Sequence, residues 1–274
     1  MALASSSAGR SSPDAVFARL RAEAEAALKA EPVLGALLND AILAQDSLEA
    51  AVAHRVAERL AGQEVSSASI RRAFVQYFER NGKAGDILRA DLLAVLERDP
   101  ACTRLLEPVL YFKGFHAIQT HRVAHAAWLG GRSDFALSLQ SLSSQKFQTD
   151  IHPAARIGRG FFLDHATGVV IGATAVIEDE VSMLHAVTLG GSGKKSGDRH
   201  PKVRRGVLIG AGAQVFGNIE IGAGALVAAG SVVLEDVPPH KTVAGSPARV
   251  VGDVTEAAPS HAMDQVHDVI DSGI

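Results

Sequence analysis

Two polar clusters interrupt apolar segments in the second half of the chain, and both contain residue types that acid–base chemistry requires. They are residues 149–153 (TDIHP) and residues 163–168 (LDHATG). An imidazole can accept a proton from a substrate hydroxyl while a carboxylate orients it. An Asp and a His on successive coils of a repeat can stack at one corner, so the clusters predict a general base. The Asp and His of either cluster, taken alone, would also fit a row of stacked polar side chains inside the repeat.

A hydrophilic segment, residues 190–202, follows these clusters and reads GGSGKKSGDRHPK. Loops inserted into a rigid repeat commonly carry function. The glycines and lysines suggest a phosphate-binding loop, but a Walker A motif needs Gly-Lys followed by Ser or Thr, and Lys195 follows Gly193-Lys194. The segment is therefore predicted to be a functional loop of another kind, with a solvated surface loop as the alternative.

Other histidines give weaker signals. His121 and His125 are four residues apart and could bind zinc from one face of a helix. Arg122 replaces the Glu of an HExxH motif, however, and no third ligand is indicated. Packing or surface roles are expected for this pair, and no metal is predicted. His185 lies in the repeats and could line a cleft, but nothing assigns it a role.

The first half of the chain must supply helices to position these groups. Residues 12–144 are rich in Ala, Leu, Glu and Arg, with apolar residues three and four apart. A helix over residues 86–98 should end at Asp99-Pro100, because a residue before proline avoids helical geometry. Asp99 is thus expected at a helix end. Further helices are predicted over residues 110–129 and 132–144.

In the second half an apolar residue recurs at every sixth position. The series runs through Ile151, Ile157 and Leu163, resumes after a two-residue slip at Ile171, Ile177, Met183 and Leu189, and returns after the loop as Val203, Ile209, Val215, Ile221, Val227 and Val233. Each hexapeptide can supply one short strand and one corner, so three of them make a triangular coil. The spacing predicts a parallel β-helix.

Composition excludes several classes of function. The chain has 274 residues, 47% of them hydrophobic, and a formal net charge of -3 without a basic stripe. A sizeable core is therefore possible, and nucleic acid is not an expected partner. Cys102 is the single cysteine, which favours a cytoplasmic location. No apolar run approaches the roughly 20 residues that span a bilayer, so no membrane association is predicted.

Several segments together resemble serine O-acetyltransferases of the bacterial type, in the hexapeptide-repeat acyltransferase superfamily. They are ERDPA, PVLYFKGFHAIQTHRVAH, FQTDIHPAARIG, LDHATGVVIG, VTLGGSGKKSGDRHPKVRRGVLIGAGA, GSVVLEDVPPH and AGSPARVVG. The resemblance covers about residues 95–252 and implies an α+β chain in two parts. These are a helical domain (1–149) and a left-handed parallel β-helix (150–252) with the inserted loop, followed by a flexible tail (253–274).

The resemblance implies transfer of acetyl from acetyl-CoA to the L-serine hydroxyl, giving O-acetyl-L-serine and CoA in cysteine biosynthesis. His165 would be the general base and Asp150 its orienting partner. Asp99 and Asp164 would accept hydrogen bonds from the serine ammonium. Arg199 would pair with the serine carboxylate, and His200 would complete the pocket.

The same resemblance implies binding partners and an assembly. The CoA arm would lie between subunits, against the backbone of Gly191, Ala211 and Ala229. The assembly would be a homotrimer through the β-helix, or a hexamer formed as a dimer of trimers. L-Cysteine would inhibit by feedback, and the C-terminal Ile274 would dock into O-acetylserine sulfhydrylase.

Three rival functions are also compatible with the sequence. One is another hexapeptide acyltransferase that acts on a sugar or on a different amino acid. The second is a zinc carbonic anhydrase, which would need His152, His165 and His185 to converge on one metal. The third is a non-catalytic scaffold that regulates the sulfhydrylase through its tail.

Overall fold

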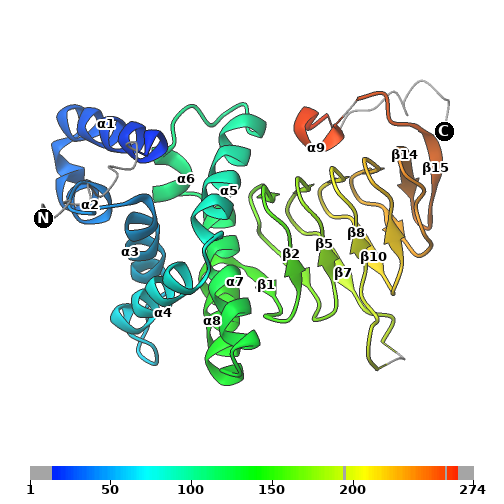
Figure 1. Ribbon diagram of the computed structural model, residues 1–274. Helices are drawn as coiled ribbons and strands as arrows, with labels where there is room; N and C mark the ends of the chain where they lie inside the picture. Colours follow the sequence, from blue (N-terminus) through cyan, green and yellow to red (C-terminus); the bar gives the residue numbers. More distant parts are fainter. Residues whose placement is uncertain (1–13, 194–195, 257, 265–274) are drawn as a thin grey trace, which may run out of the picture.

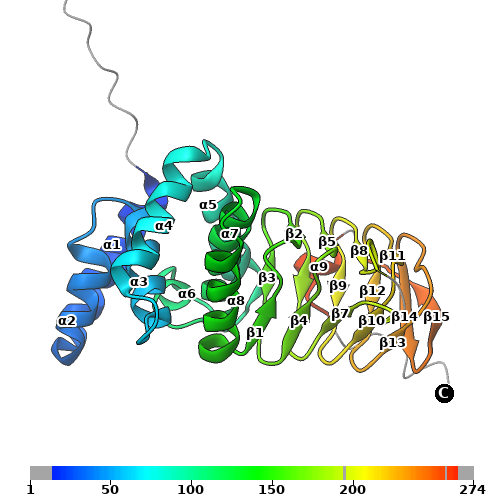
Figure 2. The same cartoon turned by 90° about the horizontal axis from the view of Figure 1, so that it is seen from below.

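The first part of the chain is a stack of helices. The structure, a computed structural model, describes residues 14–193, 196–256 and 258–264. The helices in chain order are α1 (Ala15–Ala30), the short turns η1 (Pro32–Leu34), α2 (Gly35–Leu38) and η2 (Asn39–Leu43), then α3 (Leu48–Leu60), α4 (Ser67–Arg80), α5 (Ala84–Arg98), α6 (Leu106–Leu110), α7 (Lys113–Leu129) and α8 (Ser133–Phe147). They lie at one end of an elongated β-helix, with α7 and α8 beside its first coil (Figures 1 and 2).

Local signals set the helix ends that matter for the site. α5 ends at Arg98, and Asp99 is its C-cap with an extended backbone, as the Asp99-Pro100 pair predicted. The helix predicted to begin at residue 110 begins at Lys113, because Phe112 adopts an extended conformation at the N-cap. The chain therefore bends between α6 and α7, close to the polar cluster of residues 163–168.

The second part is a left-handed parallel β-helix of hexapeptide repeats, which confirms the predicted fold class. Its strands are β1 (Thr149–Ile151), β2 (Arg156–Ile157), β3 (Phe162–Leu163), β4 (Val169–Ile171), β5 (Val176–Ile177), β6 (Ser182–Met183), β7 (Thr188–Gly190), β8 (Lys202–Val203), β9 (Leu208–Ile209), β10 (Gln214–Phe216), β11 (Glu220–Ile221), β12 (Leu226–Val227), β13 (Val232–Val233), β14 (Lys241–Gly245) and β15 (Ala248–Asp253). β15 pairs antiparallel with β14 and closes the end of the solenoid.

Three parallel sheets form the faces of the prism. Their strand orders are β1-β4-β7-β10-β13, β11-β8-β5-β2 and β15-β14-β12-β9-β6-β3. The six-residue series points inwards, and every member is buried except Ile157, which packs against the core from a partly buried position. The hexapeptide prediction is confirmed at the level of individual side chains.

Two edges of the prism matter for the site. The first, here called the histidine corner, joins the six-stranded sheet to the five-stranded sheet and consists of residues 164–168, 184–187, 210–213 and 228–231. The second, the loop corner, joins the five-stranded sheet to the four-stranded sheet and consists of residues 152–155, 172–175, 191–201 and 217–219. The inserted loop thus occupies a different edge from His165.

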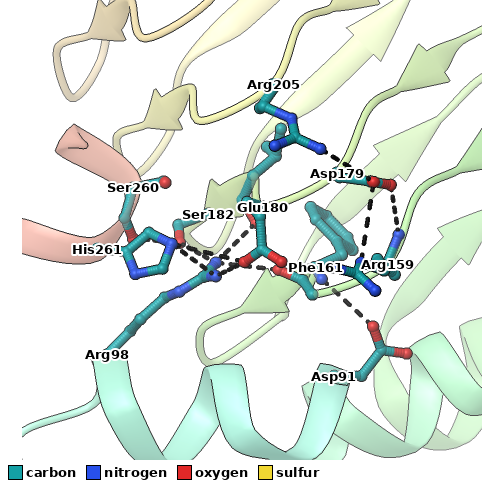
Figure 3. A network of polar contacts seen from close by, with 12 residues as sticks. Asp91, Arg98, Arg159, Phe161, Asp179, Glu180, Ser182, Arg205, Ser260 and His261 are labelled. Atoms are coloured by element: carbon teal, nitrogen blue, oxygen red, sulfur yellow. Dashed lines mark hydrogen bonds and ion pairs between the residues drawn. The ribbon is translucent and has the colours of Figure 1, made fainter. Parts of the chain in front are cut away.

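Arg98, the last residue of α5, binds the end of this helix to the β-helix. Its side chain is 1% exposed and forms an ion pair with Glu180, and it donates hydrogen bonds to the Gly160 carbonyl (3.0 Å) and the Ser182 hydroxyl (3.1 Å). The short helix α9 (Pro259–Ala262) completes the network, because the Ser260 carbonyl accepts a hydrogen bond from Ser182 at 2.6 Å (Figure 3). The neighbouring Asp99 is therefore held at a fixed place beside the first coils.

A second junction involves Asp91 on α5 and Arg122 on α7. Arg122 donates to both Asp91 carboxylate oxygens, at 2.6 Å from Nε and 2.8 Å from Nη2, and also to the carbonyl of Gly158 at 2.7 Å. Asp91 accepts a further hydrogen bond from the Phe161 amide (3.3 Å; Figure 3). The pair satisfies backbone groups of the first coil that would otherwise be left without partners.

In the described residues no helix is both long and apolar enough to cross a membrane.

Candidate active site

A cavity of about 400 Å³ lies where the end of α5, the start of α7 and the first turn of the histidine corner meet. Its polar lining residues are Asp99, Tyr111, Lys113, Asp164 and His165. Apolar groups, among them Phe112 and Phe162, form much of the remaining wall. The structure thus brings together three of the predicted site residues, two carboxylates and one imidazole, from parts of the chain 65 residues apart (Asp99 and Asp164).

His165 is an accessible imidazole beside a carboxylate. Its side chain is 73% exposed, and its Nε2 atom lies 3.6 Å from Oδ2 of Asp164. The His185 ring on the next coil meets it edge to face, with 5.8 Å between ring centroids. An exposed imidazole can reach a substrate hydroxyl, and the 3.6 Å separation is longer than a hydrogen bond but can shorten when a substrate binds.

Asp99 and Asp164 give this cavity an affinity for positive charge. Burial raises the pKa of the Asp164 carboxyl; His165 opposes that shift, and the nearby Asp99 carboxylate adds to it. Burial and the Asp99 carboxylate together leave the ionised form of Asp164 in need of more positive charge than His165 supplies. A bound ammonium group between the two carboxylates would supply that charge.

Asp150 lies apart from this cavity. It occupies the middle of β1 on the five-stranded sheet, and its Oδ1 accepts a hydrogen bond from Gln140 of α8 at 2.6 Å. Within the described chain the carboxylate beside His165 is that of Asp164. The pairing of Asp150 with His165 stays a prediction.

His200 is anchored firmly in the inserted loop. Its ring is buried, and Nδ1 lies 2.7 Å from the Thr174 hydroxyl of the preceding coil. That hydroxyl accepts hydrogen bonds from the Arg199 amide (3.0 Å) and the His200 amide (3.2 Å). Burial, followed by the charge of Arg199, lowers the pKa of His200, so its ring is neutral near pH 7. The ring covers Gly172, where a Cβ atom would lie 2.0 Å from it.

The loop corner and the histidine corner hold separate halves of the predicted site. Arg199 is half-buried and, with Gly191, lines an open cavity of about 750 Å³ at the loop corner. Ala211 and Ala229 instead follow His165 and His185 along the histidine corner. A single chain therefore does not bring the two arms of the predicted site together.

A single chain does not form the zinc ligand set of the carbonic anhydrase alternative. His152 lies on the loop corner and packs against Trp128, with 5.2 Å between ring centroids, while His165 and His185 lie on the histidine corner. Within one chain these three rings cannot converge on one ion. Throughout the part of the chain that the structure describes, no group of three His, Cys, Asp or Glu residues is arranged to hold a metal.

His121 and His125 pack where α7 meets the first coil. Burial lowers the pKa of His121 to about 3, so this ring is neutral at pH 7. His125 makes a 2.7 Å hydrogen bond through Nδ1 with the Pro153 carbonyl. These contacts agree with the expected packing roles.

Tyr111 and Lys113 line the cavity but are not among the site residues predicted from the sequence. The Lys113 ammonium donates hydrogen bonds to the Thr167 hydroxyl and to Gln148 Oε1 (3.1 Å). Both residues fall in the YFKGF segment, which breaks the apolar pattern between α6 and α7 with one lysine and one glycine. That interruption was the signal available, but only the fold places it beside His165.

The chain is similar to serine acetyltransferases along most of its length. The family model described as the N-terminal region of serine acetyltransferase matches residues 16–120. The serine acetyltransferase of Salmonella typhimurium is 49% identical over 250 residues, which are 91% of this chain and 92% of that protein.

Solved structures agree in fold along most of the chain. A serine acetyltransferase from Brucella abortus, in complex with coenzyme A, is 60% identical with a TM-score of 0.87, over 88% of this chain and 96% of that one. A serine acetyltransferase in complex with cysteine is 46% identical with a TM-score of 0.90, over 92% and 98% of the two chains. The similarity extends across both the helices and the β-helix.

Proposed function

This chain belongs to the serine acetyltransferase family, and from that premise we propose that His165 is the general base of an acetyl transfer at the histidine corner. The chain is an acyltransferase that moves an acetyl group from acetyl-CoA to the hydroxyl of L-serine, giving O-acetyl-L-serine and CoA. The observation that carries the assignment is the exposed His165 imidazole, on a cavity it shares with Asp164 and Asp99.

In the proposed mechanism, the serine hydroxyl oxygen attacks the thioester carbonyl carbon while His165 removes the hydroxyl proton. The tetrahedral intermediate then collapses, the C–S bond breaks, and the imidazolium returns the proton to the CoA thiolate. A positioned base of this kind typically contributes about 10²- to 10⁴-fold in rate. Asp150 is the proposed orienting partner of His165. Asp164 lies beside Nε2 of His165, which supports an electrostatic role for its carboxylate in addition to its proposed binding of the serine ammonium.

Asp99 and Asp164 are proposed to hold the serine ammonium. Their proximity and the burial of Asp164 favour a cationic group in the cavity, which argues against a sugar acceptor. Asp99→Asn and Asp164→Asn should each raise KM for L-serine by at least about tenfold, because a hydrogen bond to a charged group contributes about 1.5–3 kcal/mol. KM for acetyl-CoA should change little.

Arg199 and His200 are proposed to act on the active site of a neighbouring subunit. They lie on the loop corner, whereas His165 lies on the histidine corner, so a trimer that faces one corner with the other would complete the pocket. Arg199 would pair with the serine carboxylate as a planar fork. Mixing inactive His165→Ala chains with inactive Arg199→Ala chains should restore activity, because some interfaces in mixed trimers then hold two intact halves.

Acetyl-CoA is proposed to bind between the same two corners. Gly191 lies on one corner, Ala211 and Ala229 lie on the other, and their small side chains let a ligand approach the backbone. The coenzyme A complex of the Brucella abortus relative supports this co-substrate. The helical parts of two trimers are proposed to pair into a hexamer, which sedimentation at several protein concentrations would test.

L-Cysteine is proposed as a competitive inhibitor. It differs from serine by sulfur in place of oxygen, and the complex of a related enzyme with cysteine supports binding to this fold. Initial rates should show that cysteine raises the apparent KM for L-serine without lowering kcat. An unchanged rate at saturating cysteine would count against the proposal.

Two further proposals concern partners and location. Ile274 lies outside the described residues, and docking of the C-terminus into O-acetylserine sulfhydrylase stays a proposal. Deleting Ile274 should abolish that complex and spare acetylation. A cytoplasmic location is proposed because Cys102, the single cysteine, is buried as a free thiol.

Acceptor analogues test the assignment of the substrate. N-Acetyl-L-serine lacks the ammonium group, L-serine methyl ester lacks the carboxylate, and a hexose offers hydroxyls alone. We expect CoA release with L-serine and at most a few per cent of that rate with each analogue. Equal rates with the hexose would favour the rival acyltransferase, and no release with any acceptor would favour a scaffold.

A further inference from the structure

The first turn of the histidine corner is two residues longer than the turns stacked on it. β3 and β6 are in register at Leu163 and Met183, and β4 and β7 are in register at Val170 and Thr188. The chain therefore takes seven steps from Leu163 to Val170 but five from Met183 to Thr188. The two-residue slip in the hexapeptide series is located in this turn.

The two added residues, His165 and Ala166, have positive φ angles, which are unusual for residues other than glycine. Each turn of the corner has one residue with positive φ at an equivalent place, namely Gly168, Ala186, Gly212 and Gly230. The first turn alone has two more, His165 at φ 55° and Ala166 at φ 60°. Left-handed backbone at non-glycine residues persists where the surrounding structure holds it, and it is concentrated at active sites.

The start of α7 packs against this turn from the side where no earlier coil exists. At Gly114 a Cβ atom would lie 2.0 Å from the Leu163 carbonyl oxygen and 3.4 Å from the Ala166 Cβ, so only glycine allows the approach. One residue earlier, the Lys113 ammonium donates to the Thr167 hydroxyl and to Gln148 Oε1. Gly114 therefore contacts the turn before and within the His165–Ala166 pair, and Lys113 contacts it immediately after that pair.

We propose that Lys113 is a positioning residue for His165, since its ammonium ties Thr167 to Gln148 and so fixes the two-residue insertion that presents the imidazole to the substrate. Gly114 allows the close approach that this tie requires. The inference rests on the proposed role of His165 as general base. Lys113 would act on catalysis through the backbone of the turn that contains His165, without contacting the reacting atoms.

Four single variants, and the double variant Lys113→Met/Thr167→Val, test the proposal by steady-state kinetics with L-serine and acetyl-CoA. Lys113→Met removes the ammonium and retains much of the side-chain length, while Lys113→Arg keeps donors for both acceptors. Thr167→Val removes the accepting hydroxyl. Lys146→Met, at an exposed site near the end of α8, is the matched control.

We expect Lys113→Met to lower kcat by about 10- to 100-fold, the effect of a small misplacement of a catalytic group, with both KM values within about twofold of wild type. Thr167→Val should act similarly, and the double variant should be no worse than the more impaired single variant, because both remove one interaction. Lys113→Arg should recover most of kcat, and Lys146→Met should match wild type.

Two kinetic results would overturn the proposal. One is wild-type kcat in Lys113→Met, and the other is a change in KM alone, which would place Lys113 in contact with substrate. A measurement without turnover separates this proposal from the proposed function. The His165 imidazole NMR signal should shift in Lys113→Met and stay in place in Lys146→Met, whether or not serine is the acceptor; an unmoved signal would also overturn the proposal.

Discussion

The buried Asp91–Arg122 pair should carry much of the stability of the junction between the helices and the β-helix. The two side chains are 1% and 7% exposed, and Asp91 also accepts hydrogen bonds from Gln119 (2.9 Å) and the Phe161 amide. Asp91→Ala would leave the Arg122 guanidinium buried without its carboxylate. Breaking such a pair from one side costs about 3–5 kcal/mol of unfolding free energy.

Urea unfolding followed by circular dichroism, at one fixed protein concentration, measures this loss. Asp253→Ala is the control, because the Asp253–Lys241 pair is solvent-exposed and such pairs contribute about 0–1 kcal/mol. KM for L-serine should also rise in Asp91→Ala, since α5 carries both Asp91 and, at its end, Asp99. A loss no larger than that of Asp253→Ala would refute the assigned role of the junction.

Three further predictions follow from single contacts. Burial lowers the pKa of His116 and His121 to about 3, below the ordinary 6.5. Their contribution to the free energy of unfolding is therefore fully present above pH 6.5 and falls by about 2 kcal/mol per histidine between pH 7 and 5. His121→Phe should flatten that pH dependence in urea titrations. Gly172→Ala should displace the His200 ring and raise KM for L-serine by about tenfold. Burial raises the pKa of Cys102 to about 12, so disulfide reagents at pH 8 should label it only after denaturation.

The sequence predicted the β-helix well because its determinants are local. One apolar side chain per hexapeptide must point inwards, so spacing alone identified the core from Ile151 to Val233. The break at Asp99-Pro100 is equally local and placed Asp99 correctly at the end of α5. Even the slip in the series marked the place of the added residues His165 and Ala166.

What the sequence alone did not predict depends on contacts between distant segments. Arg98 and Lys113 are ordinary surface residue types. Only the packing of α5 and α7 on the first coils buries Arg98 and brings Lys113 to Thr167, in the turn that contains His165. The separation of Arg199 from His165 is likewise a property of the triangular cross-section. Spacing along the chain does not show which edge of a prism a residue will occupy.

The most direct test of the central claim compares wild type with His165→Ala in one assay, the release of CoA thiol from acetyl-CoA with and without L-serine. We predict serine-dependent release by wild type and a loss of at least about 10²-fold in kcat for the variant, the contribution of a general base. Coenzyme A binding and the unfolding temperature should be unchanged. Serine-dependent release by His165→Ala at the wild-type rate would contradict the assignment of His165 as the base.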